Sequence, residues 1–196
     1  MNLLGNGLYQ AGHDEDALSV QEAELSTLRR LGVSEAEILN VQNNIACSYH
    51  RAGRLEETMR MQRDVYTGYV KSYGEETIET LIAANNYALL LNEIKRFEEA
   101  KSLLRKVMPV ARRVLGENDE TTLRMRWNYG EALWRADSAT LDDIREATRT
   151  LEDAGRAARR VLGGAHPTAV GIYCSLKFLR EWLRACDTPS SAREDK

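Results

Sequence analysis

Proline, cysteine and alternating β-type runs are scarce in this sequence. Its 196 residues include only three prolines, and Ala, Leu, Glu and Arg are frequent, which favours helix. The three cysteines, Cys47, Cys174 and Cys186, form no close motif. Because the chain also starts without a basic leader or a long apolar core, we expect neither a secretory signal nor a membrane span. An odd number of cysteines then indicates reduced thiols, and we expect a cytoplasmic protein.

The sequence also lacks motifs for catalysis, cofactors and metals. It has no Gly-rich phosphate loop, no nucleophile elbow and no paired catalytic carboxylates. Cys47 and His50 have a spacing that two metal ligands use on a helix, but no second pair completes a zinc site. We therefore expect no enzyme, no cofactor and no metal. The net charge of −3 argues against nucleic acid as a partner, and the cluster Arg156, Arg159 and Arg160 is interpreted as a solvated face.

What the sequence does contain is a repeat of about 42 residues. The asparagines Asn44, Asn86 and Asn128 are each 42 residues apart. Glycines that end the repeats follow the same period, at Gly32, Gly74 and Gly116, and Gly163 comes 47 residues later. The longer step implies five inserted residues in the polar stretch around residues 136–140. A fixed period in this range is typical of a helical solenoid.

Helix signals divide each repeat into two helices. Residues 1–12 are interpreted as a shortened first helix, and a second helix is expected over residues 14–31, ended by Gly32. Ser34 and Glu37 have the spacing of a capping box that starts the next helix. The second helices of the following repeats, residues 56–73 and 98–115, are long. Breakers lie inside these helices and the matching helix of the fourth repeat, at Gly68, Pro109 and Gly155, and we predict a kink at Pro109.

Small residues recur where the two helices of a pair are expected to cross. They are Ala46, Ala88 and Gly130 on the first helices, and Thr58, Ala100 and Ala147 on the second. Larger side chains are expected around each crossing, namely Tyr49, Leu91 and Leu133 with Leu55, Phe97 and Ile144. The last helix, about residues 168–186, has an apolar stripe of Ile172, Leu176, Leu179 and Leu183 that is expected to seal the stack.

The pattern Asn-Asn-φ-Ala-x-x-Tyr followed by Gly-Arg-φ-Glu-Glu, read over residues 43–57, resembles the tetratricopeptide repeat. More narrowly, it resembles the 42-residue repeat of kinesin light chains, with the family turn nearest its usual form at residues 163–168. The chain departs from kinesin light chains in its short first repeat, its insertion and its lack of a long heptad segment. The resemblance implies an all-α fold, a right-handed superhelical solenoid of about four antiparallel helix pairs plus a C-terminal capping helix.

The repeat boundaries follow from this resemblance. A solenoid is expected over residues 1–187, with repeats at about 1–33, 34–75, 76–117 and 118–164 and the capping helix at 168–186. Residues 188–196 are polar and are expected to form a disordered tail.

The resemblance also implies a function, a non-catalytic adaptor that binds a short extended peptide in a concave groove. The groove is expected to contain Asn43, Asn44, Cys47, Arg51, Asn85, Asn86, Leu89, Arg124, Asn128 and Arg135. An amide side chain can both donate to and accept from a peptide bond, so the repeated asparagines would hold the ligand backbone. The alternative is that these asparagines bridge neighbouring helices. Trp127 and Trp134 share a helix face and serve either as a stacking platform or in the core.

The nature of the partner is less constrained. Family grooves are often basic and favour acidic peptides, an expectation that Glu93 and Glu131 weaken here. The rival function is a structural assembly module that forms a homodimer, or continues a longer array, through its end helices. Its expected interface is the apolar surface of Tyr173, Phe178 and Trp182 on the last helix.

Overall fold

The computed structural model describes residue 7 and residues 12–187. The predicted first helix falls outside this part except for Gly7 and Gly12, and the predicted tail lies wholly outside it. In the described part the chain is all-α and has no strand, as predicted. Its helices are α2 (Asp14–Leu31), α3 (Glu35–Arg51), α4 (Leu55–Tyr73), α5 (Ile78–Glu93), α6 (Phe97–Val114), α7 (Glu120–Arg135), α8 (Leu141–Val161) and α9 (Pro167–Asp187).

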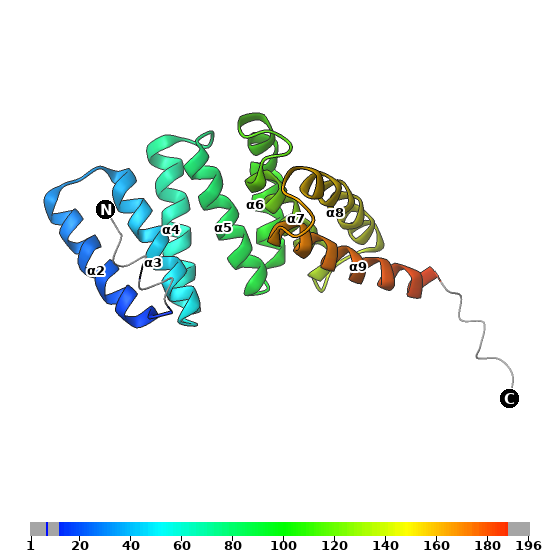
Figure 1. Ribbon diagram of the computed structural model, residues 1–196, viewed down its shortest axis with the longest axis horizontal. Coiled ribbons are helices and arrows are strands. Elements are labelled where there is room, and N and C mark those ends of the chain that lie inside the picture. Colours follow the sequence, from blue (N-terminus) through cyan, green and yellow to red (C-terminus); the bar gives the residue numbers. More distant parts are fainter. Residues whose placement is uncertain (1–6, 8–11, 188–196) are drawn as a thin grey trace, which may run out of the picture. The chain divides into compact units, whose positions relative to one another are not determined.

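The chain divides into two compact units, residues 1–91 (unit 1) and residues 92–196 (unit 2), with the boundary near the end of α5. In unit 1, α3 packs between α2 and α4, and Figure 1 shows the three helices side by side. In unit 2, α7 packs against α6, α8 and α9, and α8 also packs against α9. Each unit is therefore a layered set of neighbouring helices with its own core.

The signals that were expected to start and end helices are present in the structure. Gly32 ends α2 in the left-handed region, with φ 64°, and its N–H donates to carbonyls of the last turn. Ser34 and Glu37 form the expected capping box at the start of α3. The five extra residues of the fourth repeat are shared between a longer connection, residues 136–140, and a longer second helix. α8 has 21 residues where α6, the second helix of the preceding repeat, has 18.

The small residues of the repeat are buried, which confirms their predicted place in the core. Ala46, Ala88, Ala100 and Ala147 have no exposed surface, and Thr58 is 2% exposed. Gly130 of α7 lies against Leu151 of α8, so closely that a Cβ atom there would be 2.7 Å from Leu151 Cδ2. The backbones of α7 and α8 can approach this far only because position 130 has no side chain.

The three expected breakers do not interrupt their helices, since α4, α6 and α8 are each continuous. Gly68 and Gly155 instead make room for neighbours. A Cβ atom at Gly68 would lie 2.6 Å from Leu39, and one at Gly155 would lie 3.2 Å from Ile172. The bend at Pro109 stays a prediction.

One expected core residue is exposed. Phe97 and Ile144 are 9% and 5% exposed, but Leu55 is 46% exposed. Leu55 is the first residue of α4, and the guanidinium of Arg54 covers the ring of Tyr49 at 4.5 Å instead. A cation–π contact therefore covers a ring at the end of the α3–α4 pair.

We predict that Gly130→Ala lowers the free energy of unfolding by about 1–3 kcal/mol, because the added methyl group overlaps Leu151. The matched control is Gly164→Ala, since a Cβ atom there meets only Arg159 Cγ at 3.9 Å. The control is expected to change stability by less than about 0.5 kcal/mol. Urea unfolding followed by circular dichroism measures both variants, and equal stabilities would contradict the close-packing account.

Candidate peptide-binding face

Partly exposed side chains of α3 and α5 form the candidate site in unit 1. Asn44, Cys47 and Arg51 follow the helical spacing of one face of α3, and Asn86 and Leu89 do the same on α5. We call these five residues the front face of unit 1. Arg51 is exposed, Leu89 is 37% exposed, and the other three are half-buried. The front face thus combines amide, thiol, cationic and apolar groups within reach of a ligand.

Asn43 links three helices of unit 1 and does not belong to the front face. Its Oδ1 accepts from Gln62 Nε2 of α4 at 3.4 Å and from Asn86 Nδ2 of α5 at 3.3 Å. Asn43 therefore bridges neighbouring helices, as the alternative expects. Its bond to Asn86 also uses one N–H of the Asn86 amide. Asn85 is 2% exposed, so its amide is a core group.

A hollow of about 650 Å³ lies beside Asn44, where the second half of α2 and the first half of α3 meet. Asn40 and Asn44 line it on the α3 side. Tyr69 of α4 donates its hydroxyl to Asn40 Oδ1 at 2.7 Å, which holds this amide in place. Burial raises the pKa of Glu24, another lining residue, above its usual value. We call this feature the α2–α3 hollow.

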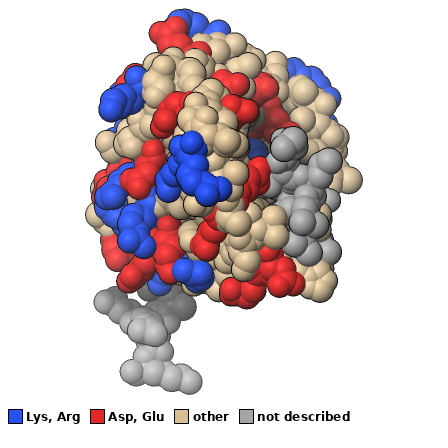
Figure 2. All heavy atoms as spheres, turned by 90° about the vertical axis from the view of Figure 1, so that its left-hand side faces the viewer, with Lys and Arg blue, Asp and Glu red and all other residues tan. Residues whose placement is uncertain are grey.

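The surface on the α2 side of unit 1 carries both signs of charge. Figure 2 shows Lys and Arg atoms interleaved with Asp and Glu atoms over this side. The view contains no broad basic area of the kind that would favour acidic ligands by long-range attraction.

In unit 2 the predicted groove residues are mostly engaged within the protein. Asn128 is 5% exposed, and its backbone oxygen accepts from Asn92 Nδ2 at 2.8 Å. Arg135 lies 5.3 Å from the ring centre of Phe97 and pairs with Glu131 at 3.4 Å. Arg124 is half-buried. Among the three repeated asparagines, Asn44 and Asn86 therefore have accessible surface and Asn128 has little.

Both tryptophans of α7 are half-buried and pack against α9. The indole of Trp127 fits over Gly171, where a Cβ atom would lie 2.1 Å from the ring, and donates to Ser175 Oγ at 3.0 Å. The ring of Trp134 lies against that of Phe178 in a tilted arrangement, with ring centres 4.8 Å apart. The sequence period points to Ser175, because it follows Asn128 by the same 47 residues that separate Gly116 and Gly163.

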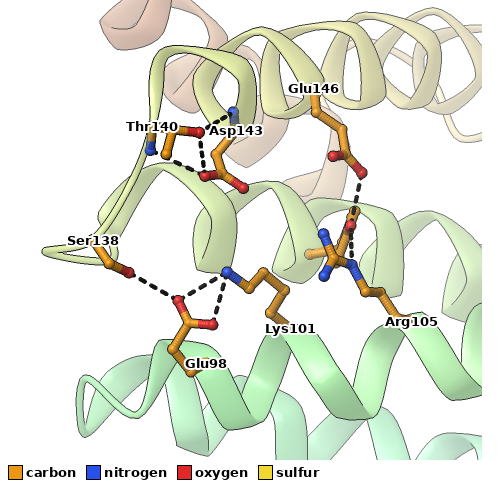
Figure 3. A network of polar contacts seen from close by, with 8 residues as sticks. Glu98, Lys101, Arg105, Ser138, Thr140, Asp143 and Glu146 are labelled. Carbon is orange, nitrogen blue, oxygen red and sulfur yellow. Dashed lines mark hydrogen bonds and ion pairs between the residues drawn. The ribbon is translucent and has the colours of Figure 1, made fainter.

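A network of polar contacts joins α6, α7, α8 and the connection between α7 and α8, as Figure 3 shows. Tyr129 Oη accepts from Arg105 Nε at 2.9 Å and donates to Glu146 at 2.7 Å. Burial raises the pKa of Tyr129, and the bond to Glu146 raises it further. Sequence reasoning did not find this network, because its members do not recur with the repeat.

The connection between α7 and α8 is part of the same network. Ser138 donates to Glu98 at 3.0 Å, and Lys101 pairs with the same carboxylate at 2.8 Å (Figure 3). Thr140 and Asp143 form a capping box that begins α8. Because these charged side chains pair with one another, we assign them a role in stabilising the fold.

The last helix buries three of the four residues of its predicted apolar stripe and also exposes a second apolar surface. Ile172, Leu176 and Leu179 are 0%, 7% and 1% exposed, and Leu183 is half-buried. Tyr173, Phe178 and Trp182 are 54%, 51% and 40% exposed. Phe178 is partly covered by Trp134, so the proposed end surface is anchored on α7.

The remaining candidates have structural roles. His166 Nδ1 accepts from the N–H of Thr168 at 3.3 Å at the start of α9, as expected from a residue of the turn. Within residues 12–187 no group of His, Cys, Asp and Glu side chains is placed to hold a metal ion. None of the described helices is long and apolar enough to cross a lipid bilayer.

Comparison with known proteins identifies the family. The tetratricopeptide repeat matches the chain at residues 38–79 and again at residues 79–140, together more than half of its length. The chain belongs to this family, which confirms the family predicted from the repeat pattern. No curated protein sequence matches it.

Solved structures define the type of repeat fold. Two crystal structures of nearly identical TPR-like repeats, from a Podosopora anserina protein described as a kinesin light chain, are similar with TM-scores of 0.74 and 0.72. They share 19% and 20% identity with this chain, cover 94% of it, and are themselves covered over 91% and 92%. BtubC (BKLC) from P. vanneervenii has a TM-score of 0.60 at 15% identity, with coverage of 99% of this chain and 83% of its own. The fold is therefore the helical repeat of the kinesin-light-chain-like type.

We predict that Asn43→Ala and Asn44→Ala differ in stability although the residues are neighbours. Asn43→Ala removes the acceptor shared by Gln62 and Asn86 and is expected to cost about 1–3 kcal/mol. Asn44→Ala removes no such link and is expected to cost less than about 0.5 kcal/mol. Urea unfolding measures both variants. Equal costs would show that the two asparagines have the same structural role.

A second prediction concerns pH. Bonds from the Thr140 side chain and backbone hold the pKa of Asp143 below its usual value of 3.8. Because the pKa of Asp143 is lower in the folded state, its carboxylate stabilises the fold at pH values above 3.8. This stabilisation is lost as the pH falls through the pKa of the folded state.

Asp143→Asn is therefore expected to cost about 0.3–1 kcal/mol at neutral pH, a difference that shrinks as the pH falls below about 4. The control is Asp142→Asn, which changes a 92% exposed neighbour that makes no bond to Thr140 and is expected to cost less. Unfolding over a pH series checks this, and a difference that does not depend on pH would contradict it.

Proposed function

We propose that this protein is a non-catalytic adaptor that binds a short extended segment of a partner protein along the front face of unit 1. The observation that carries the proposal is Asn44, a repeat asparagine that lies half-buried at the surface beside the α2–α3 hollow. Helical repeats characteristically bind ligands along extended surfaces, and membership of the tetratricopeptide repeat family supports this use.

The front face offers both backbone and side-chain recognition. The Asn44 amide can pair with one peptide bond of the ligand, for about 0.5–1.5 kcal/mol. Leu89 and Ile82 of α5 are 37% and 41% exposed and offer apolar surface to ligand side chains. The unit 2 residues Arg124, Asn128 and Arg135 are left out of this proposed site, because Asn128 is buried and Arg135 is held by Glu131.

The test is a peptide array of acidic, basic, aromatic and random segments, followed by affinity measurements on the peptides that bind. Asn44→Ala is expected to weaken binding about 2- to 13-fold and Leu89→Ala about fivefold, without loss of helical signal. Leu141→Ala is the matched control, since Leu141 is 44% exposed at the start of α8 in unit 2. Unchanged affinity in both front-face variants would reject the site.

A second candidate function is assembly through the last helix, favoured by the exposure of Tyr173, Phe178 and Trp182. Light scattering over a range of concentrations tests it. A mass that rises with concentration, and returns to that of one chain in Trp182→Ser, would support assembly. A constant mass of one chain would reject it. The cytoplasmic location stays a prediction.

A further inference from the structure

The α2–α3 hollow has an apolar wall that is open to ligand. Leu28 and Leu31 of α2 line it, with Val33 of the connecting turn and Val41 of α3. Leu31 is 71% exposed, so the rim offers apolar surface that the fold itself leaves uncovered. A volume of about 650 Å³ is large enough for one bulky side chain and part of its neighbour.

Among the residues that the structure describes, the charged side chains lining the hollow are both acidic. They are Glu24 and Glu37, and no described Lys or Arg lines it. Glu37 is fixed in position, because one of its carboxylate oxygens accepts from the N–H and the hydroxyl of Ser34, at 3.2 and 2.8 Å. The partial burial that raises the pKa of Glu24 also strengthens its attraction to a nearby cation.

Amide groups lie on the same wall of the hollow as Glu37. Asn40 and Asn44 belong to α3, as Glu37 does, and Asn40 is held by Tyr69. A peptide chain paired with Asn44 would therefore pass the mouth of the hollow, where one of its side chains can enter.

We propose that the α2–α3 hollow selects a partner segment in which a bulky apolar side chain stands next to a lysine or arginine. The apolar side chain contacts Leu28, Leu31 and Val41, and the cation pairs with Glu24 and Glu37. This inference rests on the proposed function, because it assigns a ligand class to the peptide site beside Asn44. It reverses the acidic preference expected from the family resemblance.

The experiment uses the full chain and matched fluorescent heptapeptides of Ala and Ser that carry Leu-Lys, Phe-Lys or Trp-Lys at the centre. Each has a partner peptide with Glu in place of Lys. Fluorescence anisotropy is expected to show at least fivefold tighter binding of the Lys form, with a difference that falls as salt is added. Equal affinities, or tighter binding of the Glu forms, would overturn the inference.

Variants of the hollow identify the groups responsible. Glu24→Gln is expected to reduce the Lys-over-Glu preference at least twofold, and Glu24→Lys to abolish or reverse it. Leu31→Ser is expected to weaken both peptide forms about equally. Glu56→Gln, at the exposed start of α4, is the charge-matched control and is expected to leave the preference unchanged. Circular dichroism of each variant checks that the fold is retained, and a preference unaffected by both Glu24 variants would overturn the inference.

Three further outcomes relate this inference to the proposed function. If peptide affinity depends on Asn44 but does not differ between the Lys and Glu forms, the proposed peptide site is supported and the inferred ligand class is overturned. If no peptide of either form binds, the inference is overturned, while the proposed function is decided by the peptide array and the front-face variants. If Glu24→Lys lowers the mass of the chain in light scattering, a second copy occupies the hollow and the inference is likewise overturned.

Discussion

Close approach of neighbouring helix backbones is the constraint on which the rest of this structure depends. In unit 2, Gly130 lets Leu151 of α8 reach the backbone of α7, and Gly171 lets the indole of Trp127 lie against α9. In unit 1, Gly68 does the same for Leu39. Such contacts are destabilised by a single methyl group, because a core packed to this density cannot absorb added volume. The recurring small residues of the sequence are therefore a requirement of helix packing.

Once the helices are this close, polar side chains between them must find partners inside the protein. Asn43 joins α3, α4 and α5, Asn92 joins α5 to α7 within unit 2, and Tyr129 bonds to Arg105 and Glu146. Each of these side chains makes at least one hydrogen bond within the protein and is a poor candidate for ligand binding. The side chains left for recognition are those on the outer side of the same helices, where Asn44 and Leu89 have accessible surface.

The fold could be predicted from the sequence because the packing requirements of the helices recur in every repeat. The details of the site could not be predicted, because the hydrogen-bond partners of its residues do not recur. Period and spacing identified the helices, the Ser34 capping box and the buried positions from Ala46 to Ala147. The same period could not show that Asn43 links helices while Asn44 has accessible surface. The two residues are identical and adjacent, and they differ only in which way their side chains face. Nor could it reveal the network of Tyr129, or that Arg54 covers the ring of Tyr49 while Leu55 is exposed.

The most direct measurement of the central claim is the NMR signal of the asparagine side-chain amides during titration with the tightest-binding peptide. If the front face of unit 1 binds the peptide, the Asn44 amide signals shift in proportion to occupancy, while those of Asn92 and Asn128 stay in place. Shifts confined to residues of α9, with the Asn44 signals unmoved at saturation, would contradict the account and place binding on the last helix.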